Sequence, residues 1–178
     1  MRLGLEFLRR YGESLLLLLG LALLIRVDVW MPLLITGESM LPTLQGGQIA
    51  GLNKLAYLRR PPQRGDIVAV WTDRTLIIKR VIGLPGEEIS AQDGVFFING
   101  QALPEPYVRF QGQWNIGPGK IAEDQFVVVG DNRSKTLLAV VARERILGRL
   151  MHYRGRRGLA GGGALCASQP GAVIQLGP

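Results

Sequence analysis

The sequence predicts an all-β domain of antiparallel sheets behind one N-terminal transmembrane helix. Short runs rich in valine, isoleucine and phenylalanine are separated by turn residues, which is typical of strands. Glycine and proline account for 24 and 10 of the 178 residues, and no useful helical periodicity follows the first apolar segment. That segment, at residues 14–25, contains twelve residues without a charge. The length suits one compact domain plus an anchor.

The apolar segment at residues 14–25 is too short to cross a bilayer alone. As a helix that rises about 1.5 Å per residue it spans about 18 Å, whereas the hydrocarbon core is about 30 Å thick. It can extend backwards through residues 2–13, whose arginines reach the interface, or forwards through residues 26–35, where Trp30 suits an interface. The arginines before the segment predict a cytoplasmic N-terminus and an outward-facing remainder at the plasma membrane.

A cleaved secretory signal peptide is the competing interpretation, because basic residues followed by an apolar run fit it too. No small residues at the spacing of a cleavage site follow Ile25, since Arg26, Val27 and Asp28 come next. The sequence therefore favours an uncleaved signal anchor.

The chain divides into three expected parts. Residues 1–30 form the cytoplasmic N-terminus and the anchor helix, and residues 31–152 form the domain on the outer face of the membrane. Residues 153–178 are rich in glycine, lack strand alternation and are predicted to be disordered.

Several strands are expected behind the anchor. Asn99 and Gly100 give a strong hairpin signal, and residues 101–104 begin the return strand. Residues 52–60 suit one or two helical turns. The apolar runs that predict strands are residues 66–71, 76–83, 94–100, 124–131 and 145–150.

Composition excludes several kinds of partner and cofactor. The net charge of +7 is spread over separate arginine clusters without interleaved aromatic residues, so we expect contact with anionic lipid and no nucleic-acid partner. Cys166 is the single cysteine and His152 the single histidine, so the chain can form neither an internal disulfide nor a structural zinc site. We therefore expect no metal or cofactor.

Ser39 lies in the stretch "GESMLPTL", shortly after the apolar segment. A nucleophilic serine needs a base that takes its proton and donors that stabilise the oxyanion. His152 is a poor candidate for the base because it borders the glycine-rich tail. Lys79 is the other candidate: strand alternation places it on one face with Ile77 and Val81, and apolar burial lowers the pKa of a lysine. A strand lysine that reaches solvent is the structural alternative.

Four stretches resemble the conserved boxes of bacterial type I signal peptidases. In order behind the apolar segment they are "GESMLPTL", "RGDIVAVW", "IIKRVIGLPGEEI" and "VVVGDNR", and the similarity extends from Leu24 to Arg149. The resemblance implies a membrane-bound serine endopeptidase with a Ser-Lys dyad on an all-β domain like that of signal peptidases and repressor proteases. It also implies removal of signal peptides from exported preproteins, contact with membrane lipid, and no cofactor. We expect a monomer.

The resemblance assigns roles to individual residues. Ser39 matches the nucleophile, with its backbone N–H as an oxyanion donor, and Lys79 matches the general base. Gly37 stands where some members carry a serine hydroxyl for the oxyanion, so backbone N–H groups would act there. Four apolar residues match positions that line shallow pockets for small substrate side chains, with packing in the core as the structural alternative: Ile35, Met40, Leu44 and Ile78.

One segment departs from the family pattern. After "GDNR" the chain continues with "SKTLLAVVARERILGR", which is shorter and lacks the usual Asp-Ser-Arg run. In the family a hydroxyl here hydrogen-bonds the lysine; Thr136 takes that place by direct count, and Ser134 takes it if the deletion falls earlier. Asp131 and Arg133 are expected to form a structural ion pair or turn rather than to take part in the chemistry.

Two other functions fit the sequence less well. The missing run motivates a catalytically weakened or inactive homologue that binds preproteins without cutting them. A soluble self-cleaving regulator of the DNA-damage response shares the Ser-Lys chemistry. The apolar segment, the "GDNR" stretch and the lack of a DNA-binding helical domain disfavour that regulator.

Overall fold

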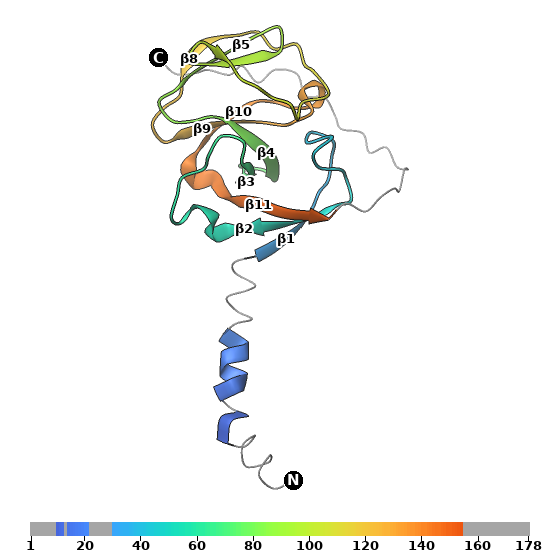
Figure 1. Cartoon of the computed structure of the whole chain (residues 1–178), viewed down its shortest axis with the longest axis vertical. Helices are drawn as coiled ribbons and strands as arrows, with labels where there is room; N and C mark the ends of the chain where they lie inside the picture. Colours follow the sequence, from blue (N-terminus) through green and yellow to red (C-terminus); the bar gives the residue numbers. More distant parts are fainter. Residues whose placement is uncertain (1–9, 13, 22–29, 155–178) are drawn as a thin grey trace.

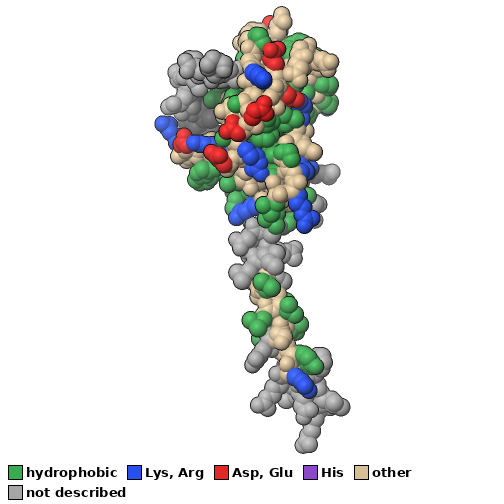
Figure 2. Space-filling model, turned by 90° about the vertical axis from the view of Figure 1, so that its left-hand side faces the viewer, with side chains coloured by type: hydrophobic (Ala, Val, Ile, Leu, Met, Phe, Trp, Pro, Cys, Tyr) green, Lys and Arg blue, Asp and Glu red, His purple; other side chains and the backbone are tan. Residues whose placement is uncertain are grey.

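The computed structural model describes residues 10–12, 14–21 and 30–154 (Figure 1). The first two ranges are helical, and the leucines of the second are exposed; Figure 2 shows hydrophobic side chains along this segment. No helix in the described ranges is long and apolar enough to cross a membrane. The transmembrane helix expected within residues 1–30 therefore stays a prediction.

The folded domain covers residues 30–154, slightly more than the predicted 31–152. Its first strand begins at Trp30 and its last strand ends at Arg154, because both residues still have pairing partners on the neighbouring strand. The glycine-rich tail expected from residue 153 lies outside the described residues from position 155 onward.

Two antiparallel sheets form the domain. The larger sheet has the order β1-β2-β11-β3-β4-β9-β10. Its strands are β1 (Trp30–Leu34), β2 (Ile49–Asn53), β3 (Ile67–Trp71), β4 (Leu76–Gly83), β9 (Gln125–Val129), β10 (Ala139–Ala142) and β11 (Ile146–Arg154). The smaller sheet has the order β7-β6-β5-β8, with β5 (Glu88–Gln92), β6 (Val95–Ile98), β7 (Gln101–Ala102) and β8 (Ile116–Lys120). The strand pairs in both sheets are antiparallel, which confirms the predicted all-β fold.

Helical structure between residues 30 and 154 is limited to short 3-10 turns. The one or two turns predicted at residues 52–60 correspond to η1 (Lys54–Tyr57), in which Asn53 caps the turn by accepting from Leu55 N–H. The other turns are η2 (Arg133–Lys135) and η3 (Arg143–Arg145).

Strand β3 is covered on both faces, which explains its unbroken apolar sequence. Ile67 and Ala69 pack into one apolar cluster, whereas Val68 and Val70 pack into another. Strand β4 pairs with β3 in a register that places Lys79 opposite Val68. The Lys79 side chain therefore extends from a strand in the interior of the sheet and not from an edge strand.

The smaller sheet packs against β4 and β9 of the larger one (Figure 1). Ile89 and Phe96 of the smaller sheet join one buried cluster with Ile82, Val127 and Val129 of the larger sheet. Burial of this apolar surface, rather than strand pairing, holds the two sheets together.

One edge strand of each sheet contains a proline. Pro32 lies in β1 and Pro118 in β8, and each strand lies at the edge of its sheet. Proline donates no backbone hydrogen bond, so an edge is where a sheet tolerates it.

Candidate active site

Ser39 lies half-buried in the loop between β1 and β2. Its carbonyl accepts a hydrogen bond from Asn132 N–H at 3.0 Å, and the side-chain amide of Asn132 donates to Glu38 O at 3.1 Å. Gly37 adopts a φ of +94°, a backbone conformation that favours glycine. Asn132 therefore fastens the Ser39 turn to the loop that follows β9.

The side chain of Lys79 is buried, with 9% of its surface exposed. Its Nζ donates a hydrogen bond to Thr136 Oγ1 at 2.8 Å. Burial lowers the pKa of Lys79 to about 8, although the carboxylate of Asp131 acts in the opposite direction. At neutral pH about a tenth of this lysine is then an uncharged amine, the form that can accept a proton, and the fraction grows as the pH rises.

Gly130 lies between the Ser39 backbone and Thr136, the hydrogen-bond partner of Lys79. A Cβ at this position would overlap Ser39 O and would lie 2.6 Å from Thr136 Oγ1. The N–H of Gly130 donates to Thr136 Oγ1 at 3.1 Å. Only glycine therefore lets the serine turn and Thr136 approach this closely.

Gly130 and Thr136 connect Ser39 and Lys79 indirectly: Gly130 lies against Ser39 O and Thr136, and Thr136 accepts from Lys79. Among the described residues, no hydrogen bond joins Ser39 Oγ to Lys79 Nζ. Catalytic hydrogen bonds often form only when substrate is bound, so the lack of this bond does not exclude proton transfer.

The hydroxyl beside Lys79 belongs to Thr136. Ser134 Oγ instead donates to Asn132 Oδ1 at 2.7 Å, which orients the amide that holds the Ser39 turn. Of the two hydroxyls considered from sequence, that of Thr136 therefore contacts Lys79, whereas that of Ser134 contacts Asn132.

Residues 8–151 match the family described as "Signal peptidase, peptidase S26". The chain belongs to this family. Membership makes it a serine endopeptidase, a hydrolase. A "Signal peptidase I" of Leptolyngbya laminosa is 35% identical over 158 residues, which cover 81% of this chain and 76% of that protein.

Other relatives carry similar names. "Signal peptidase I T" of Bacillus subtilis (strain 168) is 34% identical over 155 residues and covers 78% of this chain and 80% of that protein. A crystal structure of a signal peptidase I from Enterococcus faecalis V583 aligns with 26% identity and a TM-score of 0.42, over 52% of this chain and 98% of that one. None of these findings supports the alternative of a homologue that binds preproteins without cutting them.

The apolar residues expected at the substrate pockets gather in one cluster of the peptidase. Ile35, Met40 and Leu44 are buried in it, and Ile78 packs against it half-buried. In this structure they pack as core residues beside the Ser39 turn. Ile78 is the most accessible of the four.

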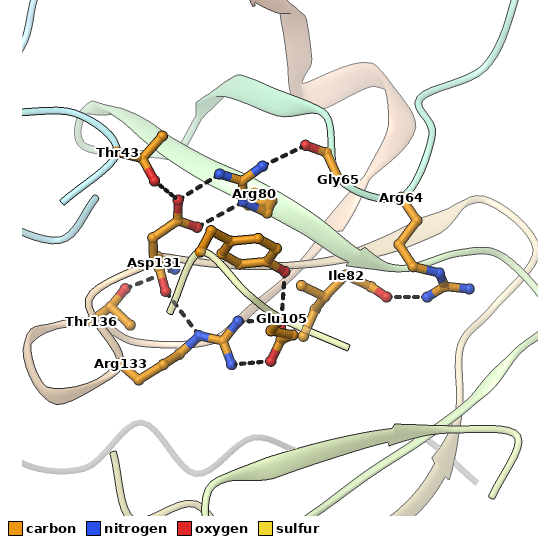
Figure 3. Close-up of polar contacts among 11 residues, drawn as sticks. Thr43, Arg64, Gly65, Arg80, Ile82, Glu105, Asp131, Arg133 and Thr136 are labelled. Atoms are coloured by element: carbon orange, nitrogen blue, oxygen red, sulfur yellow. Dashed lines mark hydrogen bonds and ion pairs between the residues drawn. The ribbon is translucent and has the colours of Figure 1, made fainter. Parts of the chain in front are cut away.

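Asp131 and Arg133 form ion pairs, but not with each other. Figure 3 shows Asp131 facing Arg80 and Arg133 facing Glu105. Sequence reasoning missed Glu105, because a lone glutamate between two prolines carries no pattern that marks a long-range partner. It also missed the bonds of Asn132 to the Ser39 turn.

The described residues form no metal site beside Ser39 and Lys79. Within residues 10–12, 14–21 and 30–154, no group of histidine, cysteine, aspartate and glutamate side chains is placed to hold a metal ion. The side chain of His152, the other candidate base, lies outside the described residues.

Proposed function

We propose that the chain is a membrane-anchored signal peptidase that removes signal peptides from exported preproteins. Ser39 is the nucleophile and Lys79 the general base. The observation that carries the proposal is the buried Lys79 amine, which donates to Thr136, a residue that together with the Ser39 turn packs against Gly130. The signal peptidase names of the relatives support the choice of substrate.

The first half of the reaction forms an acyl-enzyme. Ser39 Oγ attacks the scissile carbonyl carbon while Lys79 Nζ takes the hydroxyl proton. The carbonyl oxygen becomes an oxyanion, which accepts a hydrogen bond from the Ser39 backbone N–H, with the glycine backbone at Gly37 close by. When the C–N bond breaks, the Lys79 ammonium returns its proton to the leaving amine of the mature protein.

The second half releases the signal peptide. Water attacks the ester carbonyl and gives a proton to the neutral Lys79 amine. The C–O bond to Ser39 then breaks, Ser39 Oγ regains a proton from Lys79, and the signal peptide leaves with a free carboxylate. The amine has to be uncharged at the start of both halves, so its lowered pKa serves each of them.

Thr136 is the supporting hydroxyl of this mechanism. Its oxygen accepts from Lys79 Nζ at 2.8 Å and from Gly130 N–H at 3.1 Å, and its own proton is directed to Leu137 O at 3.3 Å. Three contacts fix the hydroxyl, so the amine is held in one orientation.

The apolar cluster beside the Ser39 turn would bind the small substrate side chains next to the scissile bond. Ile78 is the accessible wall of this site, and Ile35, Met40 and Leu44 support it from the core. A pocket of this kind favours small apolar residues because larger ones would displace a packed wall.

The anchor helix lies within residues 1–30 and is built on the apolar segment at residues 14–25, with the N-terminus in the cytoplasm and the domain on the outer face of the plasma membrane. The leucines of the described helical residues 14–21 are exposed, and apolar side chains of this density need an apolar surrounding. Lipid is therefore the second partner, and the chain acts as a monomer.

Cleavage of a preprotein by the full chain in detergent tests the proposal. The wild type should cut at the end of the signal peptide, as read from the mass of the two products, and Ser39→Ala should not cut. The proposal fails if the wild type leaves the preprotein intact from neutral to alkaline pH, or if Ser39→Ala cuts as fast as the wild type.

A further inference from the structure

The buried guanidinium of Arg133 holds the backbone on which the lysine contact depends. Its Nε donates to Gly130 O at 3.0 Å, and its side chain is fully buried. Nη1 donates to Glu105 Oε2 at 2.7 Å and Nη2 to Glu105 Oε1, which makes a bidentate pair. A buried charge of this kind requires its partner, so Arg133 stays at Gly130 only while Glu105 is in place.

Tyr107 connects this pair with the arginine that follows Lys79 on β4. Its hydroxyl donates to Glu105 Oε1 at 2.6 Å, and its ring lies 4.0 Å from Arg80 Cζ. Arg80 in turn donates to both carboxylate oxygens of Asp131, at 2.8 and 2.6 Å (Figure 3). Burial and the neighbouring carboxylate of Glu105 raise the pKa of Tyr107, so the hydroxyl stays a donor.

These contacts form a closed path from Arg80 through Asp131, Gly130, Arg133, Glu105 and Tyr107 back to Arg80. Arg80 contributes the contacts from β4, and Arg133 and Gly130 contribute those from the loop after β9. The segment between β7 and β8 joins these two parts, because it contacts both arginines. Glu105 and Tyr107 come from that segment, which lies outside the four short boxes quoted from the sequence. Neither residue contacts Lys79 or Thr136 through a hydrogen bond in the part of the chain described.

We propose that Glu105 and Tyr107 are positioning residues that hold residues 130–136 against β4, so that Thr136 and Lys79 stay in contact. The inference rests on the proposed function, in which Lys79 is the base. Loss of the Tyr107 ring removes one contact from Arg80, which keeps its hydrogen bonds to Asp131 and Gly65 O. The guanidinium is then held less firmly on the Asp131 carboxylate, and that carboxylate acts more strongly on the Lys79 ammonium. Water also reaches the amine when Thr136 shifts. Both changes favour the charged lysine.

The test compares Tyr107→Leu and Tyr107→Phe in the full chain. Tyr107→Leu removes the ring and the hydroxyl, whereas Tyr107→Phe keeps the ring on Arg80. For Tyr107→Leu we expect kcat at neutral pH to fall about tenfold, with KM changed less than about twofold and the acid limb of kcat moved to higher pH. The rate of Tyr107→Phe should lie between that of Tyr107→Leu and that of the wild type.

A titration of Lys79 provides a readout that needs no substrate. The lysines are at positions 54, 79, 120 and 135, so a 13C NMR titration of lysine Cε, assigned with Lys79→Arg, resolves the signal. Asp131 is the charged group that acts on Lys79 among the described residues. The Lys79 midpoint should be higher in Tyr107→Leu than in the wild type, and slightly higher in Tyr107→Phe.

Tyr57 offers a matched control. Its hydroxyl donates to Asp66 Oδ2 at 3.0 Å, and Arg60 and Arg143 lie 5.4 and 5.3 Å from its ring centre. In the described part of the chain, its hydrogen bonds, cation–π contacts and apolar cluster do not involve residues 130–136. Tyr57→Leu should lower the unfolding temperature but leave the Lys79 midpoint and the acid limb unchanged.

Unchanged values for Tyr107→Leu would overturn the inference: a folded variant with the wild-type Lys79 midpoint and acid limb shows no positioning role. If Tyr107→Leu does not fold, the Lys79 midpoint of Tyr107→Phe decides in the same way. A wild type that cuts no preprotein contradicts the proposed function, whereas the titration still decides whether Tyr107 positions Lys79.

Discussion

Lys79 Nζ donates to Thr136 Oγ1 at 2.8 Å, although the two residues are 57 positions apart in the chain. The hydroxyl of Thr136 is itself fixed by the backbone, through Gly130 N–H and Leu137 O. A buried amine is thus held by one oriented oxygen rather than by a counter-ion. The Thr136 bond restrains the lysine without adding a further negative charge to that of Asp131, which favours the protonated form.

Cleavage should depend on pH through Lys79. Burial lowers the pKa of Lys79 to about 8, and only the neutral amine accepts a proton, so kcat/KM should rise with pH and level off above that value. Preprotein cleavage measured from about pH 6 to about pH 10 checks this rise and the plateau that follows it. A rate that is flat across this range, or one that falls as pH rises, would contradict the assignment of Lys79 as base.

The buried lysine should cost stability at neutral pH. Its pKa is about 8 in the folded protein and 10.5 in the reference state, so between these values the unfolded chain binds more protons and stability rises with pH. Below this window the cost is fully present. Lys79→Met should therefore abolish cleavage and stabilise the fold at neutral pH by about 1 to 2 kcal/mol.

Urea unfolding at neutral pH and above the upper pKa measures that difference. The gain from Lys79→Met should shrink at the higher pH, and Lys120→Met, on an exposed strand position, should show neither gain nor pH dependence. A Lys79→Met chain that is less stable than the wild type at neutral pH would show that the Thr136 bond outweighs the cost of burial.

Gly130→Ala should separate the serine turn from the lysine. The new methyl group overlaps Ser39 O and crowds Thr136, so we expect kcat/KM to fall at least about a hundredfold. Gly117→Ala is the matched control, because a Cβ there meets no atom within 4 Å. Equal rates for the two variants would mean that the close approach at Gly130 does not matter for cleavage.

Thr136→Val should weaken the base because it removes the hydroxyl and keeps the shape. We expect kcat to fall about tenfold or more, whereas Thr136→Ser keeps the oxygen and should retain most activity. Ser134→Ala should affect the rate less, since Ser134 contacts Asn132 rather than Lys79. If Ser134→Ala is the more damaging change, Ser134 and not Thr136 supports the lysine.

The strands that could be predicted are those whose pattern is local. Residues 76–83 form β4 with the predicted bounds, because an apolar run ends at turn residues on both sides. Strand β1 was missed because its residues continue the apolar composition of the anchor and include Pro32. Strand β8 was missed because "IGPGK" has no alternation; pairing with β5 at a sheet edge makes it a strand.

The candidate site likewise has residues that local sequence patterns predict and residues that only long-range packing brings in. Ser39 and Lys79 stand in stretches that can be recognised one at a time. The proposed support cannot be predicted from such stretches, because Glu105 and Tyr107 reach Arg133 and Arg80 only through the packing of a distant segment. The choice between Ser134 and Thr136 likewise depends on how η2 turns the chain, which periodicity does not reveal.

The cleavage rate of Lys79→Ala, beside the wild type and Lys120→Ala, tests the central claim most directly. We predict a loss of at least about a thousandfold for Lys79→Ala with its fold intact by circular dichroism, because the nucleophile loses its base. Lys120→Ala should cut like the wild type. A Lys79→Ala chain that keeps more than about a tenth of the wild-type rate would contradict Lys79 as the general base.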